Sequence, residues 1–148
     1  MLAKFVMTPT GLALDRFLVR HLGFSLTIPV TARANHYPAN PALYLETVGR
    51  KSGQLRGVAL PYFTLGGRRL LVASKGGAPT DPAWALNLRA NPDAAVYIKR
   101  RRYPIRARFL EGAERDETYD TLKREITSYA HYETLTNRKI PVIVLENR

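Results

Sequence analysis

The sequence predicts an α+β fold built around a small antiparallel β-barrel. About six short apolar segments follow one another between residues 42 and 146, and most are joined by glycine- or proline-containing turns. A doubly wound parallel sheet would need a helix between most strands, and those helices are missing. The 148 residues, 45% of them hydrophobic and 24% charged, suffice for one hydrophobic core.

Residues 1–40 are expected to form an amphipathic helix and a linker. Apolar side chains recur at three- and four-residue spacing between Thr10 and about Ile28, at Leu14, Phe17, Leu18 and Leu22. Asp15, Arg16 and Arg20 should face away from this stripe, and Gly23 should weaken or end the helix. The pattern fits a helix packed on its own domain or one lying on a membrane surface. Residues 29–41 contain three prolines and are expected to cross the surface as a linker.

The domain at residues 41–148 carries the barrel. Strands are predicted at 42–48, 55–65, 69–74, 94–99, 103–110 and 141–146, and helices at 82–90 and 114–132. Gly66-Gly67 should form a hairpin turn, and an arginine-rich turn should join the fourth and fifth strands. Pro82 is expected at the first position of its helix, which Asn91-Pro92-Asp93 should end.

Composition narrows the range of functions. The chain has no cysteine, which excludes disulfides, thiolate catalysis and cysteine-ligated metals. Three scattered histidines and no convergent carboxylates predict no metal site. The net charge of +11 predicts an anionic partner, which is a nucleic acid, an acidic membrane surface or a phosphorylated small molecule. No apolar run reaches the roughly 20 residues that span a bilayer, and no signal-peptide pattern is present, so a cytoplasmic location is expected.

Two basic, glycine-containing loops are the candidate binding sites. In the first, Gly49–Gly53, backbone N–H groups can converge on an anion while Arg50, Lys51 and Arg56 add charge-assisted hydrogen bonds. This loop lacks the spacing of a phosphate-binding Walker loop, and a solvated basic hairpin turn has the same composition.

The second loop, Ser74–Pro79, leaves a strand and leads into the helix that begins at Pro82. Its glycines permit close approach to a flat ligand, and the helix start favours negative charge. Trp84 is either part of a ligand pocket or a core anchor. Asn87, on the same helix face, bonds either a ligand or a loop carbonyl.

Tyrosines form a third group. Tyr129 and Tyr132 lie three residues apart on one predicted helix face, and Tyr62 lies on a central strand. Such residues either wall an acceptor pocket and supply a hydroxyl or pack into the core.

In this order, the motifs resemble the deazaflavin-dependent nitroreductase family of actinobacteria, whose members have a split β-barrel related to FMN-binding barrels. The resemblance is carried by Leu45–Gly53, Pro61-Tyr62, Val72–Pro79, Pro82–Trp84, Asn87–Pro92 and Arg138–Leu145. It covers about residues 40–148. Many relatives have a Lys-His-Pro-like run where this chain has Thr80-Asp81-Pro82, which removes a positive charge beside the cofactor.

The resemblance implies roles for individual residues. The phosphate and polyglutamate tail of the deazaflavin coenzyme F420 would be held by Arg50, Lys51, Ser52 and Arg56. The ring would contact residues of the second loop and of the segments beside it, namely Pro61, Tyr62, Ser74, Lys75, Gly76, Gly77, Ala78, Pro82, Trp84 and Asn87. Tyr129 and Tyr132 would line the acceptor side, and with Ser74 they are the candidate catalytic residues.

The implied activity is transfer of hydride from reduced coenzyme F420 to a quinone of the menaquinone type, with nitroaromatics or activated alkenes as further acceptors. Such chemistry requires no metal, cysteine or catalytic triad from the protein. The amphipathic N-terminal helix would bring the enzyme to the inner face of the membrane. An FMN-binding reductase of the same fold and a non-enzymatic barrel that binds single-stranded nucleic acid are the alternatives.

Overall fold

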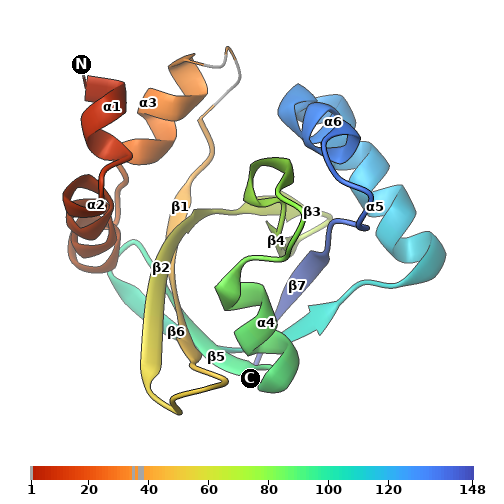
Figure 1. Ribbon diagram of the computed structural model, residues 1–148. Helices are drawn as coiled ribbons and strands as arrows, with labels where there is room; N and C mark the ends of the chain where they lie inside the picture. Colours follow the sequence, from red (N-terminus) through yellow and green to blue (C-terminus); the bar gives the residue numbers. More distant parts are fainter. Residues whose placement is uncertain (1, 35, 37–38) are drawn as a thin grey trace.

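The computed structural model describes residues 2–34, 36 and 39–148 and shows one curled antiparallel sheet with helices at its sides (Figure 1). The described residues form the strands β1 (Ala42–Val48), β2 (Leu55–Pro61), β3 (Phe63–Leu65), β4 (Arg68–Val72), β5 (Asp93–Ile98), β6 (Arg101–Phe109) and β7 (Val142–Asn147). Their order in the sheet is β2-β1-β5-β6-β7-β4-β3, and every pairing is antiparallel. The α+β class and the barrel predicted from the sequence are confirmed.

The helices of the described chain are α1 (Leu2–Val6), α2 (Pro9–Leu22), α3 (Thr27–Ala34), α4 (Ala83–Ala90), α5 (Gly112–Glu125) and α6 (Thr127–Thr134), with a 3₁₀ turn η1 at Lys75–Gly77. In Figure 1 the first three lie at one side of the sheet, α5 and α6 at the other, and α4 crosses the front between them. No helix in the described part of the chain is long and apolar enough to cross a membrane.

Two apolar clusters make up the core. The curled sheet encloses one, formed by Leu43, Leu45, Leu71, Val96, Ile105 and Ile143 with their neighbours. The other lies under α5 and α6 and contains Leu70, Tyr119, Leu122, Val142 and Val144. Strands β4 and β7 contribute successive residues to both clusters. Their apolar runs are therefore continuous rather than alternating.

The N-terminal segment differs from its prediction. The helix expected from Thr10 to Ile28 ends at Leu22, because Gly23 takes a left-handed conformation (φ 79°) and caps α2. The linker expected at 29–41 is helical up to Ala34, and its residues 35, 37 and 38 lie outside the described residues. Asp15, expected to face solvent, is 4% exposed, and its carboxylate accepts hydrogen bonds from the backbone N–H groups of Leu26 and Thr27. This carboxylate starts α3, whose first turn tolerates Pro29.

Four element boundaries also differ from the prediction. The strand expected at 55–65 is two strands, separated at Tyr62, so the sheet has seven strands. The helix expected at 114–132 is broken at Ile126, where the backbone is extended (ψ 93°). Pro82 is the N-cap of α4 rather than its first residue. The turn between β5 and β6 is only two residues long, so Arg101 and Arg102 belong to β6.

Candidate functional site

The first basic loop is a tight turn whose cationic side chains are exposed. Gly53 has φ 71°, its N–H donates to the Gly49 carbonyl, and the Gly49 N–H donates to the Gln54 carbonyl just beyond the turn. Arg50, Lys51, Ser52 and Arg56 are all exposed. In the described chain no salt bridge involves any of the three cations. Their charge is therefore available to an anionic ligand.

Asn87 fastens this loop to α4. Its side chain is 5% exposed, and its Oδ1 accepts hydrogen bonds at 3.1 Å from both the backbone N–H and the guanidinium of Arg50. Its amide nitrogen donates to the hydroxyl of buried Thr47 at 3.2 Å. In the described chain the Asn87 side chain thus bonds Arg50 and Thr47, and it orients Arg50. The sequence predicts a ligand or a loop carbonyl as its partner instead.

The second basic loop has an unusual backbone. Ser74 is in the right-handed helical region, and Lys75, Gly76 and Gly77 follow with φ of 46°, 62° and 80°. A right-handed residue followed by a left-handed one is the conformation of backbone nests, whose N–H groups converge on an electron-rich oxygen. A Cβ on Gly76 would meet nothing within 4 Å, so the loop has open space at this point.

Helix α6 closes one side of the second loop. A Cβ on Gly77 would lie 2.8 Å from the carbonyl oxygen of Tyr132, so glycine permits this approach. Tyr132 is half-buried, whereas Tyr129 is 6% exposed and its ring packs among Phe63, Tyr119 and Tyr132. Of the two candidate tyrosines, Tyr132 has the more accessible ring.

Arg138 holds the second loop from behind and was not among the residues predicted for the site. Its guanidinium donates to the carbonyl oxygens of Ala73, Ser74 and Ala78 at 2.8–3.2 Å and pairs with the Asp81 carboxylate at 2.6 Å. Both side chains are mostly buried. The sequence contains one indication of this ion pair. Thr80-Asp81-Pro82 stands where many relatives have a Lys-His-Pro-like run, and the carboxylate that it places beside a basic loop indicates a cationic partner.

The remaining predicted residues lie between or beside the two loops. Trp84 is partly buried against the core inside the sheet, and Pro82 is buried at the start of α4. Pro61 ends β2, and Tyr62, 9% exposed, lies in the same core. The second loop leads into the start of α4, and Asn87 joins the first loop to the middle of this helix. The helix rises about 6 Å from Ala83 to Asn87, so the two loops contact successive parts of one helix.

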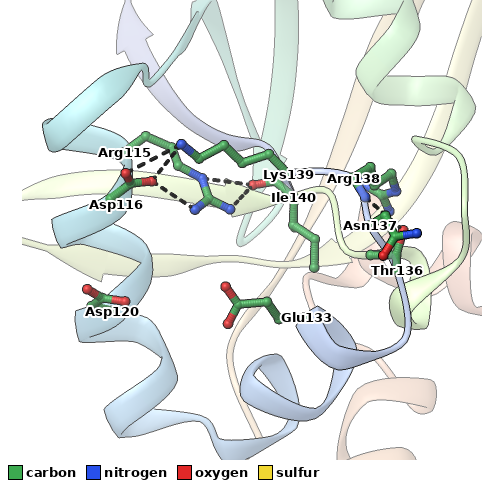
Figure 2. A pocket seen from close by; sticks show the side chains of 9 residues that line it. All are labelled: Arg115, Asp116, Asp120, Glu133, Thr136, Asn137, Arg138, Lys139 and Ile140. Atoms are coloured by element: carbon green, nitrogen blue, oxygen red, sulfur yellow. Dashed lines mark hydrogen bonds and ion pairs between the residues drawn. The ribbon is translucent and has the colours of Figure 1, made fainter.

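Two cavities lie outside this pair of loops. One, of about 490 Å³, is lined by α5, α6 and residues 136–140 (Figure 2). Asp116 pairs there with Arg115 and Lys139, and Glu133 pairs with Lys123. Its charges therefore largely neutralise one another. The other cavity, of about 250 Å³, lies between the α2–α3 connection and the sheet and includes Phe24, Ile28, Tyr62 and Lys99 in its lining. Of these two cavities of the described chain, the second is lined by a residue predicted for the site, Tyr62. In the part of the chain that the structure describes, no group of three or more potential metal ligands occurs.

Comparisons with known proteins agree with the resemblance seen in the sequence. Residues 29–147 match the family model described as F420H(2)-dependent quinone reductase. An F420H(2)-dependent quinone reductase of Mycobacterium tuberculosis is 34% identical over 149 residues, which cover 91% of this chain and 99% of the relative.

Solved structures show the same fold. The F420-H2 dependent reductase FDR-A is 39% identical, with a TM-score of 0.63 over 72% of this chain and 94% of that chain. The heme storage protein HutZ of Vibrio cholerae has a TM-score of 0.53 at 12% identity, over 72% of this chain and 81% of that chain. At that identity the second likeness concerns the fold alone.

Proposed function

The chain belongs to the F420H(2)-dependent quinone reductase family, and from this we propose how its residues bind coenzyme F420 and present it to a quinone. The protein is an oxidoreductase that takes hydride from reduced coenzyme F420 and delivers it to a quinone. When bound, the reduced cofactor supplies the hydride. Reduction of nitroaromatics and activated alkenes remains a prediction from the sequence.

We propose that the first loop binds the anionic tail of the cofactor. Arg50, Lys51 and Arg56 have no carboxylate partner within the described chain, and their charge suits phosphate and polyglutamate groups. Ser52 adds a hydroxyl beside them. Because Asn87 fixes Arg50, little side-chain freedom would be lost on binding.

The second loop is proposed to hold the deazaflavin ring. The backbone of Ser74–Gly76 offers N–H groups to ring oxygens, whereas the Gly77 N–H bonds the Ser74 carbonyl, and the open space at Gly76 admits a flat ring. Lys75 is exposed beside it, and Ala78, Pro82 and Trp84 complete that side. The observation that carries the proposal is that α4 connects the two loops, the second at its start and the first through Asn87, which suits an elongated ligand with a ring at one end and anions at the other.

On the acceptor side we propose Tyr132 and Ser74 as the residues that contact the quinone. Both are half-buried, and α6 lies against the loop through Gly77. Tyr129 is enclosed by other rings, so its proposed role is to support Tyr132 rather than to reach the acceptor.

Fluorescence titration tests cofactor choice. The protein should bind coenzyme F420, and an Arg50→Gln/Lys51→Gln variant should bind it more weakly while Arg124→Gln, on α5, should not. Turnover of a soluble quinone with reduced F420, measured at limiting F420, should likewise be lower in the Arg50→Gln/Lys51→Gln variant and unchanged in the Arg124→Gln variant. Binding of FMN without binding of F420 would favour the FMN alternative and refute the proposal.

We also propose that the quinone is reached at the inner face of the cell membrane. Helix α2 faces the protein with Gly11, Asp15 and Val19, which leaves the stripe of Leu14 and Phe17 41% and 57% exposed. A Phe17→Ser variant should lose turnover of long-tailed menaquinone in vesicles and keep turnover of a soluble quinone. Equal loss of both activities would contradict the membrane role.

A further inference from the structure

The two-residue turn between β5 and β6 has an unfavourable conformation for its sequence. Ile98 and Arg101 are the last paired residues, and Lys99 and Arg100 connect them with φ of 48° and 73°. Two positive φ values are typical of turns that favour Asn-Gly, because other L-residues are strained there. At this tip the chain instead places two long cationic side chains.

The cations of this turn are not neutralised by the protein. Lys99, Arg100, Arg101 and Arg102 are consecutive and exposed, and no salt bridge of the described residues involves them. By contrast, Arg106 pairs with Asp93 on the same strand pair, and Arg108 pairs with Glu114 and Glu146. The strained turn therefore presents a concentrated positive charge to solvent.

An exposed apolar surface lies directly beside this charge. A Cβ on Gly23 would be 2.8 Å from the Cα of Lys99, so the turn lies against the end of α2. Figure 1 shows the joined ends of β5 and β6 beside that helix. Phe24 and Lys99 line the same 250 Å³ cavity, and Leu22, Phe24 and Leu26 are 51%, 47% and 39% exposed.

We propose that Lys99–Arg102 together with Leu22, Phe24 and Leu26 form a docking surface for membranes that contain anionic lipids. The inference rests on the proposed use of a membrane quinone. It further specifies that the protein binds membranes whose lipids are negatively charged. Apolar side chains enter the interface while the adjacent cations contact anionic headgroups, and two such signals are what stable peripheral binding requires. A second copy of this chain fits less well, because it carries the same cationic turn and a net charge of +11.

Docking in this orientation also affects how the quinone acceptor reaches the protein. The cavity that Phe24 and Lys99 line is also lined by Tyr62, a residue predicted for the site. A docked protein therefore turns this cavity toward the bilayer that contains the quinone. The cationic turn thus acts in positioning the enzyme and takes no part in hydride transfer.

The test compares sedimentation of the full-length protein with vesicles of phosphatidylcholine alone and of phosphatidylcholine with phosphatidylglycerol. A Lys99→Asn/Arg100→Gly variant removes two charges and supplies the residues that the turn geometry favours, so it should fold at least as well as the wild type. Its affinity for the anionic vesicles should fall on the order of tenfold or more, and its weak binding to neutral vesicles should not change. Added salt should weaken the wild type more than the variant.

The matched control removes two cations on the other side of the molecule, in an Arg124→Gln/Lys139→Gln variant. It should bind anionic vesicles as the wild type does, and both variants should reduce a soluble quinone with unchanged kcat. Equal vesicle binding by wild type and turn variant, or equal loss in the control, would overturn the proposal. Absence of soluble-quinone turnover in the wild type would instead refute the proposed function. A dimer in solution that Phe24→Ser abolishes, without vesicle binding, would identify a second copy as the occupant.

Discussion

At the scale of single residues, the two loops of the candidate site are held in place by mostly buried polar side chains. Asn87 and Arg138 each bond a different loop, and both make several hydrogen bonds from mostly buried positions. Buried polar groups of this kind are costly to leave without partners. We therefore predict that substitutions at these two residues change cofactor affinity and stability together.

Replacing Asn87 by Ala should free Arg50 and leave the Thr47 hydroxyl without its donor. The loss should lower the free energy of unfolding by about 1–3 kcal/mol, measured by urea denaturation, and should raise the Kd for F420. Asn91→Ala is the control, because its Oδ1 accepts only the Asp93 N–H among the bonds of the described chain. If Asn87→Ala binds F420 as tightly as the control does, Asn87 has no role in positioning Arg50.

Replacing Arg138 by Met should release the second loop. Three carbonyls and the Asp81 carboxylate lose a charged donor, which should cost about 3 kcal/mol of stability. The Kd for F420 should rise more than the KM for a soluble quinone, because the loop is proposed to hold the ring. A double-mutant cycle with Asp81→Asn measures the part due to the ion pair. A higher KM for quinone with an unchanged Kd for F420 would place the loop on the acceptor side.

At the scale of elements, the molecule brings distant segments together through close backbone approaches. The second loop meets α6 at Gly77, and α2 meets the β5–β6 turn at Gly23. Helix α3 begins on the carboxylate of Asp15 from α2. The first two contacts join segments that the sequence pattern treats as independent, and the third lies within a segment that the pattern predicts as one helix.

Two neighbouring glycines test the contact between the second loop and α6. Gly76→Ala should cost about 1 kcal/mol, the penalty for a side chain at positive φ, because its Cβ has open space. Gly77→Ala should cost roughly 3 kcal/mol, because its Cβ also meets the Tyr132 carbonyl. Thermal denaturation of both variants gives the comparison, and equal losses would show that α6 does not confine the loop.

At the scale of the whole molecule, the burial of one tyrosine makes the stability of the folded state depend on pH. Tyr119 is fully buried between α5 and the sheet, and its hydroxyl donates to the Tyr129 carbonyl at 2.9 Å. Burial is the main cause that raises the pKa of Tyr119 from 10.0 to about 12. The tyrosine stays protonated in the folded protein after it has ionised in the unfolded chain.

The stability of the folded state should therefore fall as pH rises from about 10 to about 12, because the folded protein binds the proton more tightly there. A Tyr119→Phe variant should be less stable at neutral pH, having lost the hydrogen bond, but should show a smaller decline over this alkaline range. Urea denaturation of both proteins at several pH values measures the difference. Parallel curves for the two proteins would assign the decline to other groups.

The strand pattern and the two glycine-containing loops could be recognised from the sequence because they depend on local chemistry. Alternating apolar residues located β1 from Ala42 to Val48 without error, and the family likeness was confirmed. Breaks inside long apolar patterns were not recognised. At Tyr62 the chain passes from the cluster inside the sheet to the cluster that contains Phe63, whereas at Ile126 it turns so that α5 and α6 both pack on that second cluster.

By itself, the sequence determined the barrel class, the family and the presence of two basic loops, because composition, periodicity and motif order are properties of the chain. Only the tertiary structure decided which residues hold those loops. Asn87 reaches Arg50 across 37 residues and Arg138 reaches Ser74 across 64. Only folding decided that Asp15 is buried and Phe17 exposed. Such pairings and the inward face of a helix depend on which segments become neighbours, and local sequence does not encode that.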